Sequence, residues 1–173
     1  MNKQVWIEKA LGLGIQEFEI YQSTTVEKEM TWFQGQMDTL VSSKVTGTSI
    51  RGIVDGKMAN MALEEIDDSM CETVLKSLIE QAHIISNEEN DLLRKPEPIE
   101  YAKKDVTWNM ASTEYVKDIL QSLEAKILAY DPRVIQVGYL GYSQGSGSRS
   151  IVNSLGMDVQ DADAVSYTHL RAH

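Results

Sequence analysis

The stretch MDTLVSSKVTGTSIRGIVDGKMANMA, residues 37–62, decides the fold. Residues suited to a buried face recur at every second position in this stretch. This predicts strands with one buried face, because successive side chains on a strand point to opposite sides. We predict three strands, with Asp55-Gly56 as the two-residue turn before the third. Glycines inside such a pattern, here Gly47 and Gly52, indicate a bulge or a close backbone approach. The expected shared faces are Val41, Ser43 and Val45 in the first strand and Thr48, Ile50, Gly52 and Val54 in the second.

Upstream of this stretch, the pattern predicts one helix and two more strands, so that the meander has about five strands. Residues 3–13 form the helix, and residues 17–21 and 26–33 alternate as strands before a turn at residues 34–36. Lys28 interrupts the apolar side of the second strand and indicates an edge strand that is protected by charge. The inward residues of the helix are expected to be Trp6, Ala10 and Leu13, or alternatively Ile7, Ala10 and Leu11.

Two amphipathic helices are predicted over residues 66–86 and 113–130, because apolar residues recur there at spacings of three and four. Ser112 or Thr113 is the expected cap of the second helix, and Pro132 ends it. We expect the first of these helices to cover the apolar face of the sheet. The predicted stripes are Cys71, Val74, Leu75, Leu78, Ile79, Ala82 and Ile85, and then Val116, Ile119, Leu120, Leu123 and Ile127.

The remaining segments predict a connection and a final strand pair. Residues 87–109 contain two prolines and are expected to be exposed. Residues 134–142 are apolar on both faces and predict a central strand, and residues 149–153 predict its return strand after a Gly/Ser loop at residues 143–148. The order of elements predicts an α+β fold, a largely antiparallel meander sheet with helices packed on one face.

Composition narrows the class of protein. The 173 residues carry a formal net charge of -10 and no run of Lys or Arg, which argues against nucleic acid as a partner. No apolar segment is long enough to cross a bilayer, and the N-terminus has no signal-peptide core. The single cysteine, Cys71, fits a reducing compartment, so we expect a cytoplasmic protein without a membrane partner.

The three histidines raise the question of a metal site. His83 has no second ligand four residues away, so it is better explained as an ordinary helix residue. His169 and His173 form H-x-x-x-H, which would place two imidazoles on one face of a helix. No glutamate follows the first of them to act as a general base, and we therefore assign no metal ligand.

Three further features have structural explanations that we prefer. The glycine-rich residues 141–148, GYSQGSGS, lack the Lys-Ser/Thr of a phosphate-binding loop. Cys71 falls on the apolar stripe, where a thiol is a poor nucleophile. The acidic pairs at residues 64–65 and 67–68 lie at a helix start, where they oppose the helix dipole. We predict no catalytic, cofactor-binding or metal-ligating residue in this chain.

Taken together, the segments resemble the N-terminal domain of the TldD/PmbA family, which is associated with zinc-dependent proteolysis. The resemblance runs from about residue 5 to residue 163. Four motifs carry it: EFEIY at residues 17–21, the stretch at 33–62, DPRVIQV at 131–137, and Asn-Ser-Leu-Gly at 153–156. The core of the longest motif is Gly47, Arg51, Gly52, Val54, Asp55 and Gly56. The Glu-Ile-Tyr strand opening is more similar to the PmbA (TldE) arm of the family than to the TldD arm.

The resemblance implies a cytoplasmic, non-catalytic N-terminal part of a zinc metallopeptidase that shapes a substrate cavity and a subunit interface. It also implies peptide substrates and a homo- or hetero-oligomer of TldD/PmbA-type subunits. The family's zinc motif, His-Glu-x-x-x-His, lies downstream of this domain in TldD-type subunits and is not in this sequence, so no catalytic or metal residue is carried over. Zinc is expected only in a TldD-type full-length protein or partner. The alternative is a non-catalytic binding or assembly module, such as a PmbA-type partner subunit without metal.

The domain boundaries follow from the same resemblance. We expect residues 1–163 to be the family's N-terminal domain, with the C-terminal domain missing. Residues 164–173 include VSYTHLRAH, which resembles a translated sequencing adapter. We expect this tail to be non-native and to pack poorly.

Overall fold

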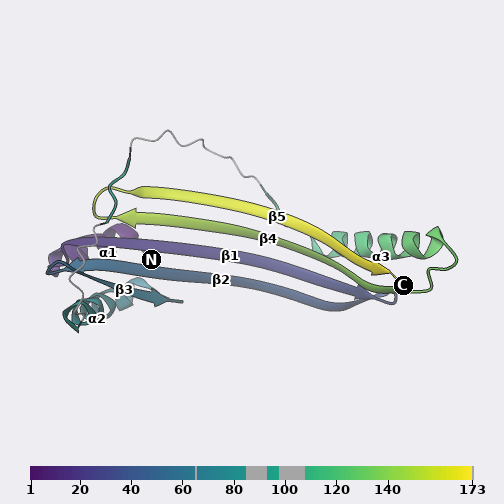
Figure 1. The fold of residues 1–173 in the computed structure, drawn as a ribbon, viewed down its shortest axis with the longest axis horizontal. Helices are drawn as coiled ribbons and strands as arrows, with labels where there is room; N and C mark the ends of the chain where they lie inside the picture. The colour runs from purple at the N-terminus through teal and green to yellow at the C-terminus, as the bar shows by residue number, and fades with distance from the viewer. Residues whose placement is uncertain (65, 85–92, 98–107, 173) are drawn as a thin grey trace. The chain divides into compact units, whose positions relative to one another are not determined.

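The computed structural model describes residues 1–64, 66–84, 93–97 and 108–172. Within these ranges, the strands form one five-stranded sheet in the order β3-β2-β1-β4-β5, and the predicted α+β class is confirmed (Figure 1). None of the described helices has the length and apolarity that a membrane span requires. The elements are α1 (Lys3–Gly12), β1 (Glu17–Phe33), β2 (Gln36–Val54), β3 (Lys57–Leu63), the 3₁₀ turn η1 (Asp68–Met70), α2 (Cys71–Ile84), α3 (Thr113–Tyr130), β4 (Val137–Asn153) and β5 (Asp158–Ala172).

The strands are longer than we predicted. The two strands expected in residues 17–33 are one strand, β1, and the first two strands of the opening stretch are one strand, β2. The Gly/Ser-rich residues 143–148 lie inside β4 and not in a loop. Small residues weaken a strand but do not end it, because neighbouring strands on both sides still pair with its backbone. The turns at Gln34-Gly35 and Asp55-Gly56 are confirmed, and both have positive φ at both positions.

The predicted edge position of β1 is wrong, and the predicted interior position of β4 is confirmed. β1 lies between β2 and β4, and β4 lies between β1 and β5. Lys28 is accommodated on this interior strand because its Nζ donates a hydrogen bond to Thr113 Oγ1 at 2.6 Å. Lys28 therefore makes a polar contact with α3 and does not protect a sheet edge.

The described residues group into two compact units, and β1, β2, β4 and β5 each contribute to both. Unit 1 consists of residues from Met1–Thr24, Val45–Lys103 and Ser148–Asp161. Unit 2 consists of residues from Thr25–Lys44, Lys104–Gly147 and Ala162–His173. Each unit has its own hydrophobic core and its own long helix.

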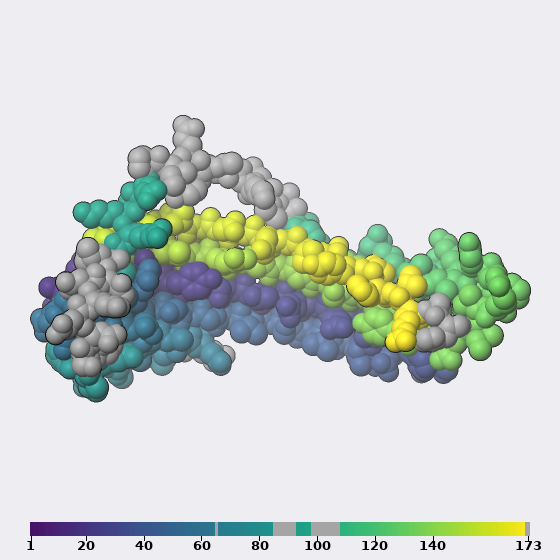
Figure 2. Space-filling model, in the orientation of Figure 1, coloured from purple at the N-terminus to yellow at the C-terminus, as the bar shows by residue number. Residues whose placement is uncertain are grey.

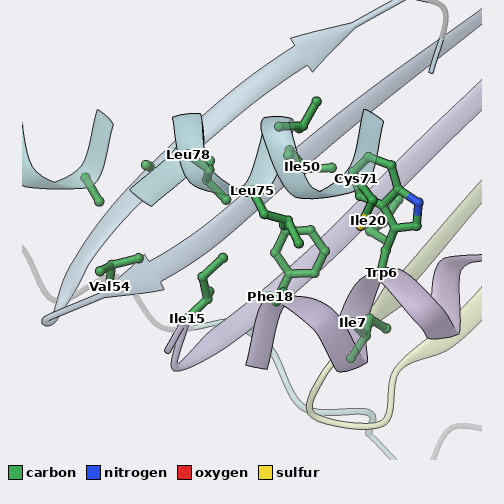
Figure 3. Close-up of a cluster of buried hydrophobic side chains, with 14 residues drawn as sticks. Trp6, Ile7, Ile15, Phe18, Ile20, Ile50, Val54, Cys71, Leu75 and Leu78 are labelled. Atoms are coloured by element: carbon green, nitrogen blue, oxygen red, sulfur yellow. The ribbon is translucent and has the colours of Figure 1, made fainter. Parts of the chain in front are cut away.

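The core of unit 1 confirms that α2 covers the sheet. Phe18 and Ile20 of β1 and Ile50 of β2 lie in one buried cluster with Leu75 and Leu78 of α2 (Figure 3). The predicted face of the second strand is confirmed, since its four residues are all buried. The stripe of α2 is also confirmed, with Ile79 partly buried and Ile85 outside the described residues. The buried cluster is Trp6, Ile7, Ala10, Ile15, Phe18, Ile20, Ile50, Val54, Ala59, Cys71, Val74, Leu75, Leu78 and Ala82.

The buried face of α1 combines residues from the two sets that we predicted to point inward. Trp6, Ile7 and Ala10 are buried, whereas Leu11 and Leu13 are 44% and 41% exposed. The inward positions assigned to both leucines are therefore wrong. The reason is that Ile15, just after the helix, fills the core at that end of the helix.

Gly52 marks the close backbone approach that its place in the strand predicts. A Cβ atom at Gly52 would lie 2.9 Å from Ile15 Cγ2 and 3.0 Å from Leu78 Cδ2. At Gly47, by contrast, the nearest atom is Ser23 Oγ at 3.6 Å, which is an ordinary contact. The prediction of a close approach is thus confirmed at Gly52 and not at Gly47.

Replacing Gly52 with alanine is expected to lower the free energy of unfolding by about 1–3 kcal/mol, because the added methyl overpacks the core. Urea denaturation measures this loss as a lower midpoint at an unchanged slope. Gly12→Ala is the matched control: a Cβ at Gly12 meets no atom within 4 Å, and alanine favours the helix. Equal midpoints for Gly52→Ala and the parent chain would contradict the packing around Gly52.

The core of unit 2 is built on α3. Ser112 caps this helix, since its Oγ accepts a hydrogen bond from Tyr115 N at 3.1 Å, and Asp131 follows its end as predicted. The predicted stripe is confirmed in that Val116 and Leu120 are buried and its other three members are partly buried. The buried cluster is Met30, Trp32, Val116, Leu120, Val137 and Leu140.

The predicted burial of the first face of the opening stretch is wrong. Val41 and Val45 are 54% and 59% exposed, and Ser43 is half-buried. In unit 2 the buried residues Met30 and Trp32 place α3 against the even-numbered side of β1. Alternation along β2 was correctly recognised, but it does not reveal which of its two faces a helix covers.

Candidate functional site

The predicted metal candidates do not come together in the structure. His83 Nε2 lies 3.6 Å from Asp55 Oδ2, and both side chains are exposed to solvent. His169 lies on strand β5 and not on a helix, and His173 lies outside the described residues. Across the part of the chain that the structure describes, no group of three or more His, Cys, Asp or Glu side chains could hold a metal ion. The described residues therefore do not fit a zinc ion.

Cys71 has the buried position that we expected, and the acidic pair Asp67 and Asp68 makes structural hydrogen bonds, whereas Glu65 of the other pair lies outside the described residues. Cys71 is buried, and burial raises the pKa of its thiol. Asp67 caps η1 through Ser69 N at 2.8 Å, and hydrogen bonds from Ser69 lower the pKa of its carboxyl. Asp68 Oδ1 accepts hydrogen bonds from Asn2 N at 2.8 Å and Trp6 Nε1 at 2.9 Å, which lower its pKa.

A polar cluster with two buried members and one exposed arginine lies in unit 1, at the end of the sheet where β1 begins. We call Glu19, Arg51 and Asn153 the polar node; they lie on the neighbouring strands β1, β2 and β4. Glu19 is 5% exposed and Asn153 is 4% exposed. The guanidinium of Arg51 donates to Glu19 Oε1 at 2.7 Å, and Asn153 Nδ2 donates to Glu19 Oε2 at 3.2 Å. A buried carboxylate is tolerated here because both of its oxygens accept hydrogen bonds.

Asn153 connects the polar node to two stretches of backbone. Its Oδ1 accepts hydrogen bonds from Leu155 N and Met157 N, each at 3.0 Å, and so it closes the turn between β4 and β5. Its Nδ2 also donates to the carbonyl oxygen of Arg94 at 2.9 Å. The node therefore orients backbone, and it contains no nucleophile with an adjacent base.

Residues 93–97 belong to unit 1 and lie near this node. Leu93 is buried, so the predicted exposure of residues 87–109 is wrong at this position, although residues 94–97 are exposed. The backbone N–H of Leu93 donates to Glu17 Oε2 at 3.0 Å, which explains how the segment is held. Residues 87–92 and 98–107 of that prediction lie outside the described residues.

The sequence motifs contain all three members of the polar node but do not bring them together. Glu19 belongs to EFEIY, Arg51 to the longest motif and Asn153 to the Asn-Ser-Leu-Gly turn. The signal that could have connected them is the pair of opposite charges on β1 and β2. Its use requires the register of the two strands, which the sequence pattern leaves open.

A groove of about 240 Å³ lies on the sheet of unit 2 and follows β1, β2, β4 and β5 on the side that carries Glu27 and Glu29. Ser143 and Gly145 of β4 are small and leave space beside these glutamates. The lining is Glu27, Lys28, Glu29, Val41, Ser43, Ser143, Gln144, Gly145, Val165 and Tyr167.

Two of these lining residues belong to the tail that we expect to be non-native. Residues 164–172 lie in β5, and the side chains of residues 165–171 are exposed (Figure 2, yellow). Backbone pairing in the sheet and exposure of the side chains are compatible with either origin of the tail. Its non-native origin stays a prediction.

Residues 18–86 match the family described as PmbA/TldA metallopeptidase domain 1, and residues 107–172 match the PmbA/TldA metallopeptidase central domain. No curated protein matches the chain in sequence.

Solved structures share the fold at low sequence identity. The chain is similar to TldE from Thermococcus kodakarensis, with 19% identity over 98% of the chain and a TM-score of 0.77. It is also similar to proteins named as candidate modulators of DNA gyrase from Thermotoga maritima and Bacteroides thetaiotaomicron. For these two, identity is 18% and 17% over 98% and 93% of the chain, with TM-scores of 0.78 and 0.70. The chain spans 38% of the length of each of these three proteins.

Proposed function

Because the chain belongs to the PmbA/TldD metallopeptidase family, we propose that it is the N-terminal part of such a peptidase and shapes a cavity for peptide substrates. In this proposal the chain itself is not catalytic. It acts in the cytoplasm within an oligomer of TldD/PmbA-type subunits. Zinc, where the assembly uses it, is bound outside the described residues.

The observation that carries this proposal is the origin of the groove in unit 2. Glu27 and Val41 come from the region that matches the first family domain, and Ser143 comes from the region that matches the central domain. The groove therefore exists only when both regions fold into one sheet. A concave surface that two regions build together, with carboxylates and small side chains, is suited to binding an extended chain rather than to cleaving it.

The purified chain is expected to show no hydrolysis of a fluorogenic peptide library or of casein, with or without added zinc. The physical reason is that the described residues provide no activated nucleophile and no metal-ligating group. The measurement is the initial rate with zinc, and again after a chelator has been added. Turnover that the chelator abolishes would show that the chain binds a catalytic metal, and would contradict the proposal.

A second candidate is an assembly module, and the edge of β2 in unit 2 favours it. β3 pairs only with Thr48–Val54 of β2, so the described residues provide no strand beside the earlier part of β2 on that side. Leu40 and Val41 are exposed along this edge, and an unpaired edge strand is a place where another chain can add a strand. The full-length reading frame separates the two candidates: a downstream His-Glu-x-x-x-His supports a TldD-type enzyme, and its absence supports a PmbA-type partner.

A further inference from the structure

We propose that residues 93–97 are a docked strap, and that Glu17, Asn153 and the turn after β4 form the seat that binds it. The seat is a docking site for an extended segment with an apolar first residue, and its occupant is this chain's own Leu93–Glu97. This inference is independent of the proposed peptidase role, because it rests only on contacts within unit 1.

The seat contacts the strap at three points. Glu17 Oε2, at the start of β1, accepts a hydrogen bond from Leu93 N at 3.0 Å. Asn153 Nδ2, at the end of β4, donates to the carbonyl oxygen of Arg94 at 2.9 Å. The Pro96 ring lies beside Gly156, where an added Cβ would be 4.0 Å from Pro96 Cγ. In Figure 1 the strap is the teal stretch beside the turn between β4 and β5.

The seat recognises main chain and one buried side chain. Both hydrogen bonds go to backbone groups of the strap, and Leu93 is 5% exposed, whereas Arg94 and Lys95 are exposed. A hydrogen bond to a carboxylate is stronger than one between neutral groups, so Glu17 holds the N–H of Leu93 firmly. The contacts therefore fix an extended backbone and place two basic side chains in solvent.

The strap is prepared for this seat by its sequence. Lys95 precedes Pro96, and a residue before proline is steered away from the helical region toward extended backbone. Pro96 itself has a fixed φ. A segment that is already extended loses less conformational entropy on docking, which favours the bound state.

The polar node acts on the strap through Asn153. Glu19 Oε2 accepts from Asn153 Nδ2, and the two backbone amides of the following turn hold Asn153 Oδ1. The amide of Asn153 is therefore fixed in the orientation that donates to Arg94. This makes Glu19 and Arg51 positioning residues for the strap. It also fixes one point of the connection between the two family-matched regions, residues 18–86 and 107–172.

Limited trypsin digestion of the full chain tests the proposal. The reporting bond is Arg94–Lys95, since the bond after Lys95 precedes proline and resists trypsin. Cleavage requires this backbone to leave the seat, so its rate follows the population of the released strap. Glu17→Ala and Leu93→Ala are each expected to raise the rate of cleavage after Arg94 about tenfold, which corresponds to the loss of one charge-assisted hydrogen bond or of one buried side chain.

Three comparisons make the result specific. Glu17→Gln keeps an oxygen that accepts from Leu93 N but loses the charge, so it should reverse most, though not all, of the rise seen in Glu17→Ala. Glu27→Ala removes an exposed glutamate elsewhere on β1, outside the seat, and should leave the rate unchanged. Cleavage after Lys76 in α2 reports global unfolding in every variant, because that bond lies in a helix packed on the core.

A rise after Arg94 alone, largely reversed in Glu17→Gln, supports the docked strap. Two results would overturn it: a parent-like rate after Arg94 in both Glu17→Ala and Leu93→Ala, or a parallel rise after Arg94 and Lys76 in both. Amide hydrogen exchange at Leu93 gives an independent readout, since Glu17→Ala should remove the protection of that N–H while the amides of α2 stay protected.

Discussion

Leu78→Ala is expected to lower the free energy of unfolding by about 2–5 kcal/mol, which places it among the costliest single substitutions in unit 1. Leu78 is fully buried on α2 and belongs to the cluster that includes Phe18 and Ile50. Its Cδ2 atom also lies close to the strand backbone, 3.0 Å from where a Cβ atom of Gly52 would be. Alanine removes this contact and leaves a cavity, because the strand backbone at Gly52 has no side chain with which to fill it. Urea denaturation monitored by circular dichroism measures the loss.

The matched control lies on the same helix. Ile84→Ala removes a comparable aliphatic side chain that is 83% exposed, and it should change the free energy of unfolding by less than about 0.5 kcal/mol. Equal stabilities of Leu78→Ala and Ile84→Ala would show that α2 does not cover the sheet in solution. A change of slope in the denaturation curve would indicate instead that the unfolded state had changed.

The parts of the fold that followed from the sequence are those in which periodicity and burial coincide. Along α2, every third or fourth residue is apolar because one stripe of the helix faces the strands, and the stripe was read directly. The second half of β2 was equally clear, since Thr48, Ile50, Gly52 and Val54 are buried at every second position, although Ile53 is buried as well. In these segments a local pattern is the direct consequence of one packed face.

The predicted strand boundaries and positions are wrong where the type of residue does not match its place in the sheet. Gly145 and Gly147 suggested a loop, but β4 pairs with β1 and β5 on its two sides, and this pairing carries the strand through them. Lys28 suggested an edge strand, because it places a charge on the apolar side of β1. The charge is accommodated on this interior strand because Thr113 accepts its hydrogen bond. Both errors concern tertiary partners, which a single strand does not encode.

The polar node shows the same limit for the candidate site. The carboxylate of Glu19 is buried because Arg51 and Asn153 reach it from the two neighbouring strands. These residues are 32 and 134 positions away from Glu19 in the chain. Alternation along β1 places Glu19 on the strand face opposite Phe18 and Ile20, and it gives no sign that a carboxylate on that face is buried. These partnerships depend on the strand register, which does not follow from a local pattern.

Glu124→Ala is expected to lower the free energy of unfolding by about 1.5–3 kcal/mol, the largest effect of a polar substitution that we predict in unit 2. Glu124 is buried on α3, on the same side as Val116 and Leu120. Its Oε2 accepts a hydrogen bond from Trp32 Nε1 at 2.7 Å and another from Gly35 N at 3.0 Å. Alanine would leave the indole N–H of the buried Trp32 without an acceptor, and that desolvated donor is the main cost.

The second part of the cost comes from the turn between β1 and β2. Gln34 and Gly35 both have positive φ, a conformation that is strained for glutamine, and the carboxylate of Glu124 holds Gly35 N in place. Glu124→Gln keeps one acceptor oxygen and should lose less stability than Glu124→Ala. Gln121→Ala, an exposed position on the same helix, should change stability by less than about 0.5 kcal/mol. If Glu124→Ala loses as little stability as Gln121→Ala in thermal and urea unfolding, then the carboxylate does not bridge α3 to this turn. The loss of an acceptor costs so little only where its donor is exposed to water.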